Sequence, residues 1–99
     1  MSLRENTQHV SGVKKGKVML YALSTCPWCR KTKALLNNLR VDYTYVDVDL
    51  LSSDDREEAL EEVRKWNPPC SFPTLVINDN KCIVGFKEDE TREALSGGK

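Results

Sequence analysis

The chain lacks the features that would bind a nucleic acid or a membrane surface. Its 99 residues carry 15 basic and 15 acidic side chains, so the formal net charge is zero and there is no basic surplus for phosphates. No apolar run approaches the ~18 residues that span a bilayer, and the first residues lack the apolar core of a signal peptide. We therefore expect a cytoplasmic protein that binds neither nucleic acid nor membrane.

Histidine is almost absent, which restricts metal and base chemistry. His9 is the only histidine, and its polar N-terminal surroundings favour a surface position. Asp47 and Asp49 alternate with valines near the end of an expected strand, but no histidine accompanies them. We therefore interpret these two carboxylates as a polar strand face or a turn rather than a metal site, and we expect no bound metal.

Cysteine is present four times, and two of the four form the motif Cys26-Pro27-Trp28-Cys29. A mostly apolar run over residues 17–23 precedes the motif and has the length and composition of a buried strand. Residues 27–39 follow with leucines at helical spacing. The motif is therefore expected at a strand-to-helix turn, where a cysteine pair suits redox exchange or metal capture.

This position predicts different chemistry for the two sulfurs. Cys26 falls near the N-cap with Pro27 at the first helical position, so free backbone N–H groups and the helix dipole favour a thiolate there. Cys29 lies one turn further on, where we expect a partly buried side chain that remains a thiol. The predicted reaction is attack of the Cys26 thiolate on a disulfide, after which Cys29 closes a Cys26–Cys29 bridge and releases the reduced product.

The rest of the chain predicts alternating strands and helices. Residues 1–16 form an N-terminal extension that is either flexible or adds a short edge strand over 9–13 before the 17–23 strand, and residues 17–96 form the domain. The further expected elements are a strand over 43–49, a helix from Ser52 to Trp66, a hairpin of strands 72–77 and 81–86, and a helix over 88–95. This β-α-β-α-β-β-α order predicts a mixed four-stranded sheet with helices on both faces.

Three features together are similar to the thioredoxin fold and, within it, to the glutaredoxins. They are the Cys-Pro-Trp-Cys motif after the first strand, the Ser71-Phe72-Pro73-Thr74 segment, and the Val84-Gly85-Phe86 end of the fourth strand. The resemblance covers residues 17–95 and implies a thiol–disulfide oxidoreductase that reduces protein or low-molecular-weight disulfides. It also implies a cis Phe72-Pro73 peptide beside the cysteines, with the backbone of Phe72 pairing with the substrate.

The resemblance implies catalytic roles for Cys26 and Cys29 and a set of residues that bind substrate or glutathione: Pro27, Trp28, Phe72, Pro73, Gly85, Phe86 and Lys87. It implies no tightly bound cofactor, with glutathione or another thiol or dithiol reductant as co-substrate.

Residues 21–25 contain no lysine, and Gly85-Phe86 stands where glutathione-using members often carry Gly-Gly. These departures resemble members that take electrons from a thioredoxin-reductase-type enzyme, and a ferredoxin-linked reductase is a further expected donor. We expect a monomer whose protein partners carry disulfides.

The other two cysteines and the alternative functions follow from the same residues. Cys70 precedes Pro73 by three residues, and we weigh an accessory redox thiol against an inert loop residue. We interpret Cys82 as a small core residue. An all-cysteine zinc site, an iron–sulfur cluster held through Cys26 as in some glutaredoxins, and a redox-dependent binding module without turnover stay open as alternatives.

Overall fold

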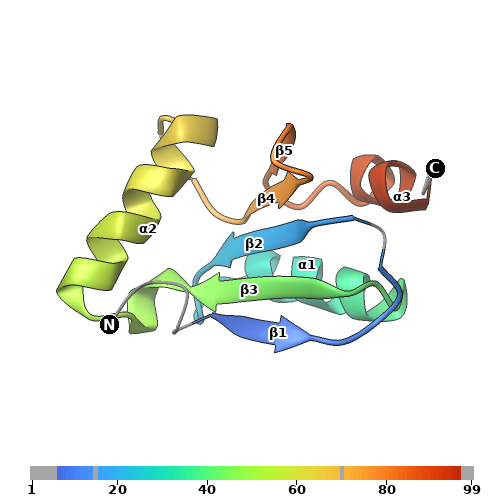
Figure 1. The fold of residues 1–99 in the computed structure, drawn as a ribbon, viewed down its shortest axis with the longest axis horizontal. Coiled ribbons are helices and arrows are strands. Elements are labelled where there is room, and N and C mark those ends of the chain that lie inside the picture. The colour runs from blue at the N-terminus through green and yellow to red at the C-terminus, as the bar shows by residue number, and fades with distance from the viewer. Residues whose placement is uncertain (1–6, 15, 70, 97–99) are drawn as a thin grey trace.

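A single mixed sheet of five strands forms the centre of the molecule (Figure 1). The computed structural model describes residues 7–14, 16–69 and 71–96. The elements in chain order are β1 (Gln8–Val10), β2 (Val18–Ala22), α1 (Pro27–Asn38), β3 (Tyr43–Asp47), the 3₁₀ turn η2 (Val48–Leu50), α2 (Ser53–Trp66), β4 (Thr74–Ile77), β5 (Lys81–Val84) and α3 (Glu88–Ser96). None of the helices within these described ranges is long and apolar enough to cross a membrane.

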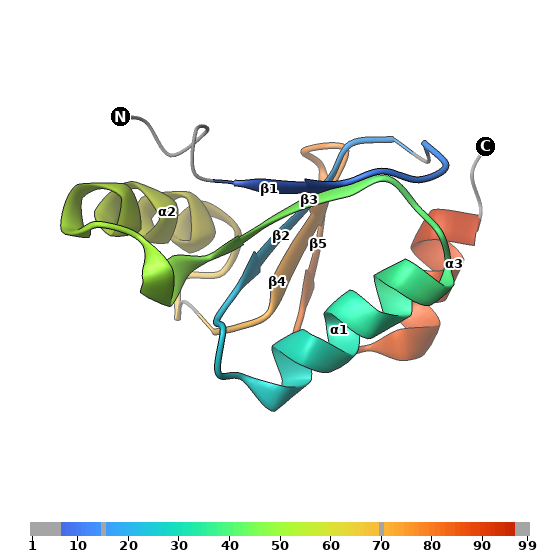
Figure 2. The ribbon, with the colours of Figure 1, turned by 90° about the horizontal axis from the view of Figure 1, so that it is seen from below.

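The strands lie in the order β1-β3-β2-β4-β5, with helices on both faces of the sheet. β2 pairs with β3 in parallel and with β4 antiparallel, and β4 pairs with β5 antiparallel. Figure 2 shows α2 on one face of the sheet and α1 with α3 on the other. The mixed sheet and the two helical layers predicted from the sequence are confirmed, and they form a thioredoxin-like fold.

The prediction of four strands was wrong, because the N-terminal segment adds a fifth. β1 pairs antiparallel with β3, with His9 opposite Thr44, and an isolated bridge joins Val13 to Val41 further along the same edge. Both edges of β2 are occupied by β3 and β4, and β1 pairs with the remaining edge of β3. The N-terminal segment therefore belongs to the sheet from Gln8 onward, although residues 1–6 of the expected extension lie outside the described residues.

β2 is buried on both faces and divides the core into two clusters. Val18, Leu20 and Ala22 point to the cluster under α1 and α3, whereas Met19 and Tyr21 point to the cluster under α2. This alternation follows from the two-residue period of a strand. The partners on the α1 and α3 side include Leu36 and Leu95, and those on the α2 side include Ala59 and Val63.

β3 ends two residues earlier than its sequence pattern predicts. The strand stops at Asp47, and residues 48–50 turn into η2 before Ser52 caps α2 by accepting a hydrogen bond from the backbone N–H of Asp55. In this turn the Asp49 carboxylate accepts hydrogen bonds from Ser24 in the loop after β2. The parallel strands β2 and β3 therefore end beside each other at one edge of the sheet, which is the edge where α1 begins.

Strand β2 should carry a large share of the stability. Leu20 is fully buried, so Leu20→Ala should lower the free energy of unfolding by about 3 kcal/mol through lost burial and the cavity it leaves. Val13→Ala is the control, because Val13 is 56% exposed and its truncation should change stability by less than about 0.5 kcal/mol. Urea unfolding of both variants measures the two effects, and equal losses would contradict this description of the core.

Candidate active site

Cys26 lies at the N-cap of α1. Its backbone is extended, with φ −89° and ψ 119°, and Pro27 occupies the first turn of the helix. The Cys26 Sγ accepts a hydrogen bond from the backbone N–H of Cys29 at 3.2 Å, which satisfies one of the N–H groups that a helix start leaves unpaired. The sulfur is half-buried. A negative charge on Cys26 is therefore stabilised by this N–H and by the positive end of the helix dipole.

Cys29 has the opposite environment. Its side chain is completely buried, and its Sγ accepts a hydrogen bond from the backbone N–H of Leu23 at 3.4 Å. Burial, followed by the hydrogen bond with Cys26, holds the pKa of Cys29 well above its usual value. Cys29 therefore keeps its proton at neutral pH. Both cysteines are free, so the structure represents the reduced dithiol.

Two carboxylates at the end of β3 hold the loop and the helix that carry the cysteines. The Asp49 carboxylate accepts hydrogen bonds from the Ser24 backbone N–H at 2.8 Å and from the Ser24 hydroxyl at 2.6 Å. These two bonds hold the pKa of Asp49 below its usual value. Asp47 forms a half-buried ion pair with Lys33 of α1 at 2.8 Å. Asp49 lies in the turn η2 directly after β3, as the turn interpretation predicts, and the two carboxylates join the end of β3 to the start of the site.

Sequence reasoning missed this role, although a signal for it was present. Asp47 and Asp49 stand at the carboxyl end of a strand expected to run parallel to 17–23. The carboxyl ends of neighbouring parallel strands meet at the same edge of a sheet, and functional loops gather there. The two acids should therefore have been expected beside the loop that follows the first of those strands.

An aromatic surface lies beside the cysteine motif. Trp28 is 55% exposed, and its ring stacks on the ring of Phe86 with a centroid distance of 6.3 Å and an interplanar angle of 23°. The Lys31 ammonium group lies 4.7 Å from the centroid of the Trp28 ring, a cation–π contact. The structure thus brings together two of the predicted substrate-binding residues, Trp28 and Phe86, from opposite ends of the chain.

The Phe72-Pro73 peptide bond is cis, as the resemblance to glutaredoxins implied. Pro73 is fully buried, and its carbonyl oxygen accepts a hydrogen bond from the Gly85 N–H at 2.8 Å. Gly85 has a φ of +84°, a conformation that side chains disfavour, and this explains glycine at the position. Phe72 is half-buried and packs against both core clusters. The predicted residues Phe72, Pro73, Gly85 and Phe86 are therefore adjacent at the ends of β4 and β5.

The two remaining predicted binding residues, Pro27 and Lys87, are both exposed. Pro27 is exposed on the first turn of α1. Lys87 is exposed at the start of α3, where its carbonyl oxygen accepts a hydrogen bond from the Thr91 N–H. No ion pair involves Lys87 among the residues that the structure describes. Its positive charge is thus available to an anionic ligand.

The remaining candidates lie elsewhere. His9 is on β1, where its Nε2 lies 2.7 Å from the Asp42 carboxylate and holds the pKa of Asp42 below its usual value. Cys82 lies half-buried on β5 rather than in the core as expected, because its strand is at the edge of the sheet. Partial burial raises the pKa of Cys82. Cys70 lies outside the described residues. No three described His, Cys, Asp or Glu side chains gather in a way that would hold a metal ion.

Known proteins are similar to this chain in sequence and in fold. The family model for glutaredoxins matches residues 18–83. A glutaredoxin-like 8.6 kDa protein of the rubredoxin operon of Clostridium pasteurianum is 37% identical over 73 residues, which are 74% of this chain and 89% of that protein.

Two solved structures are similar in both sequence and fold. The glutaredoxin of Methanosarcina mazei Go1 is 61% identical with a TM-score of 0.85, and the match covers 91% of this chain and 87% of that one. The methanoredoxin of Methanosarcina acetivorans is 54% identical with a TM-score of 0.83, and covers 85% and 88% respectively. The segment that the glutaredoxin family model matches runs from β2 through most of β5 and contains both cysteines of the motif. The chain therefore belongs to the glutaredoxin family.

Proposed function

We propose that the chain is a thiol–disulfide oxidoreductase that reduces protein or low-molecular-weight disulfides, with Cys26 as the nucleophile and Cys29 as the resolving thiol. The observation that carries this proposal is the asymmetry of the pair. Cys26 is accessible at a helix start and accepts an N–H hydrogen bond, whereas Cys29 is buried behind it and keeps its proton. A dithiol reductant needs one sulfur that attacks first and one that attacks later.

In the first step the Cys26 thiolate attacks one sulfur of the substrate disulfide. A bond forms between the Cys26 Sγ and that sulfur, the substrate S–S bond breaks, and the departing sulfur leaves as a thiolate that takes a proton from solvent. This step consumes the charge on Cys26. The hydrogen bond and the nearby sulfur charge that had raised the pKa of Cys29 then disappear, and burial alone continues to raise it.

In the second step Cys29 releases its proton to solvent and its thiolate attacks the Cys26 Sγ. The Cys26–Cys29 bond forms, the mixed disulfide breaks, and the product sulfur departs as a thiolate that takes a proton from solvent, so that two electrons have passed from the dithiol to the substrate. The positive charge of Lys33 favours the ionised form of Cys29 at this stage. The order of the two attacks therefore follows from which sulfur is charged at each stage.

The predicted binding residues supply a surface for the substrate. The Trp28 and Phe86 rings offer an apolar area next to Cys26, and the Phe72-Pro73 and Gly85 segment lies at the adjoining strand ends. Lys87 offers a positive charge at the start of α3. We propose that the backbone of Phe72 pairs with the substrate peptide or with glutathione, and that Trp28 and Phe86 pack against its apolar part.

The two cysteines should respond differently to substitution. Cys26→Ser should reduce disulfide reduction to the uncatalysed background, because no nucleophile remains at the helix start. Cys29→Ser should accumulate a mixed disulfide at Cys26, which mass spectrometry detects as a mass increase that dithiothreitol reverses. Cys82→Ser is the matched control and should keep full activity, since Cys82 lies on β5. Turnover that survives in Cys26→Ser would contradict the assignment.

The carboxylate of Asp49 should matter for the rate. Asp49→Ala removes both hydrogen bonds to Ser24, so the loop before Cys26 becomes less well ordered and kcat/KM should fall about three- to tenfold. Because the pKa of Asp49 is lowered, the carboxylate stays charged even at its usual pKa of about 4 and releases the loop only in stronger acid.

A disulfide-reduction assay from neutral to acidic pH tests the predicted role of the Asp49 carboxylate. The difference between wild type and Asp49→Ala should persist through the usual carboxyl pKa of about 4 and disappear only in more acidic solution. Ser24→Ala keeps the backbone hydrogen bond and should show a smaller loss. Asp54→Ala removes an exposed acid at the start of α2 and is the control for charge. An unchanged rate in Asp49→Ala would show that this contact does not position the cysteines.

The residues before the cysteine motif and at the end of β5 bear on the electron donor. Residues 21–25 contain no lysine, and Gly85-Phe86 replaces a Gly-Gly step, so we propose that a thioredoxin-reductase-type enzyme reduces the Cys26–Cys29 disulfide faster than glutathione does. The oxidised protein should be offered, in parallel, glutathione, a thioredoxin-reductase-type enzyme with NADPH, and a ferredoxin-linked reductase. Free thiols are counted over time. Faster reduction by glutathione would overturn the proposed order of donors.

A further inference from the structure

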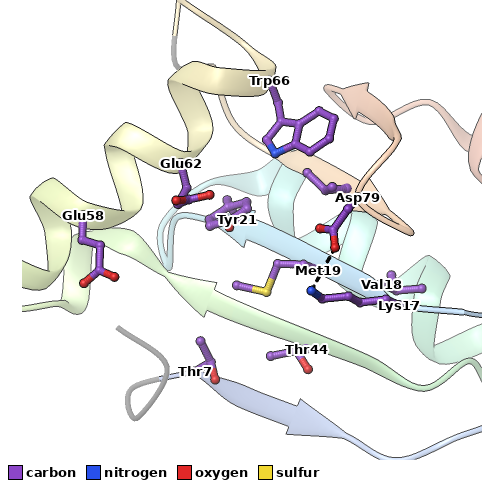
Figure 3. Close-up of a pocket in the computed structure, with 11 residues that line it drawn as sticks. Thr7, Lys17, Val18, Met19, Tyr21, Thr44, Glu58, Glu62, Trp66 and Asp79 are labelled. Atoms are coloured by element: carbon purple, nitrogen blue, oxygen red, sulfur yellow. Dashed lines mark hydrogen bonds and ion pairs between the residues drawn. The ribbon is translucent and has the colours of Figure 1, made fainter. Parts of the chain in front are cut away.

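A pocket lies on the face of the sheet that α2 covers (Figure 3). α1, which carries the cysteines, lies on the opposite face (Figure 2). It encloses about 500 Å³, within the range of about 300–1,000 Å³ typical of small-molecule sites. β2, β3, α2 and the turn between β4 and β5 contribute its walls. None of the predicted substrate-binding residues lines it, so the pocket is separate from the proposed redox site.

Tyr21 presents a hydroxyl group to this pocket. The side chain is only 7% exposed, and the structure gives its hydroxyl no hydrogen-bond partner among the described residues. No buried side-chain oxygen among these residues lacks a partner, so the Tyr21 oxygen itself is open to the pocket, where a ligand or water can supply the partner. Burial, followed by the charges of Glu62, Asp79 and Glu58, raises the pKa of Tyr21 to about 12. The hydroxyl is therefore neutral and keeps its oxygen as an acceptor.

The charged side chains around Tyr21 are mostly acidic. Glu58 and Glu62 extend from α2 on one side, and Asp79 extends from the β4–β5 turn on the other (Figure 3). Asp79 pairs with Lys17 at 3.0 Å, and Glu62 pairs with Lys65 at 3.2 Å in a solvent-exposed contact. Glu58 has no ion pair within the described part of the chain. The pocket therefore has negative charge that its own residues do not neutralise.

The remaining walls are apolar or aromatic. Met19 and Tyr21 form the floor from β2, and Trp66 lies at the end of α2 (Figure 3). Aromatic rings beside carboxylates attract organic cations, because the ring face and the carboxylate both favour positive charge and the ring also covers an apolar chain. An anionic ligand would meet three carboxylates and a single ammonium group, which Asp79 already pairs.

We propose that this pocket binds a small organic cation, a primary alkylammonium or guanidinium compound. Its charged group lies between Glu58 and Glu62 and donates a hydrogen bond to the Tyr21 hydroxyl oxygen. Its alkyl chain covers Met19 and Trp66. This site goes beyond the proposed redox function, since it uses neither cysteine and lies on the other face of the sheet.

Paired probes of the same length test the proposal. Hexylammonium and hexanoate differ mainly in the sign of their charge, and each is titrated into the full-length reduced protein at constant ionic strength. NMR spectra should show saturable shifts at Met19, Tyr21 and Trp66 with hexylammonium and none with hexanoate. Equal responses to both probes would overturn the proposal, because they would show that apolar contact alone drives binding. Hexylammonium shifts confined to the surface around Trp28 would also overturn it, because they would place the binding site elsewhere.

Variants then test the residues. The double variant Glu58→Gln, Glu62→Gln should weaken hexylammonium binding about fivefold or more, since it removes two exposed charge contacts. Tyr21→Phe keeps the ring and should also weaken binding, by about threefold, through the lost acceptor. Glu61→Gln, an exposed neighbour on α2 that does not line the pocket, is the matched control and should bind as wild type. Unchanged affinity in both test variants, or an equal loss in the control, would refute the site.

Discussion

The hydrogen bond from the Cys29 N–H to the Cys26 Sγ is the contact around which the site is organised. It exists because the chain leaves a fully buried strand, turns over three residues and starts a helix with proline, so that the sulfur of the capping residue replaces the oxygen of an ordinary N-cap. The same turn places Cys29 one helical turn further in, against the core. A single local geometry thus produces an accessible sulfur and a buried one.

The rest of the fold supports this turn from two directions. β2 is buried on both faces and fixes the start of the loop that leads to Cys26. At the end of the parallel strand β3, Asp49 holds Ser24 in the middle of that loop, and Asp47 holds α1 through Lys33. From the other side, the hairpin of β4 and β5 brings the Phe72-Pro73 segment and Phe86 next to the motif. The candidate site therefore combines residues that are about fifty positions apart in the chain.

Sequence reasoning recovered the features whose signals are local. The helix cap at Cys26, the burial of Cys29 and the capping of α2 by Ser52 depend on residue types at fixed short spacings, and all three are present. It failed where the outcome depends on strand neighbours. The choice between a flexible N-terminal segment and the strand β1, which the sequence left open, depends on the order of strands in the sheet. The early end of β3 and the half-buried edge position of Cys82 depend on it too, and residue patterns alone do not determine it. The α2-face pocket likewise arises only when segments from distant parts of the chain pack together.

The central claim is that the two sulfurs of the motif differ in accessibility and charge, and competitive alkylation tests it most directly. The reduced protein is treated with less than one equivalent of iodoacetamide, and the modified peptides are quantified by mass spectrometry. We predict that Cys26 is alkylated well before Cys29, because the Cys26 side chain is accessible and its sulfur accepts an N–H hydrogen bond, whereas Cys29 is buried and keeps its proton. Equal modification of both residues, or faster modification of Cys29, would contradict it.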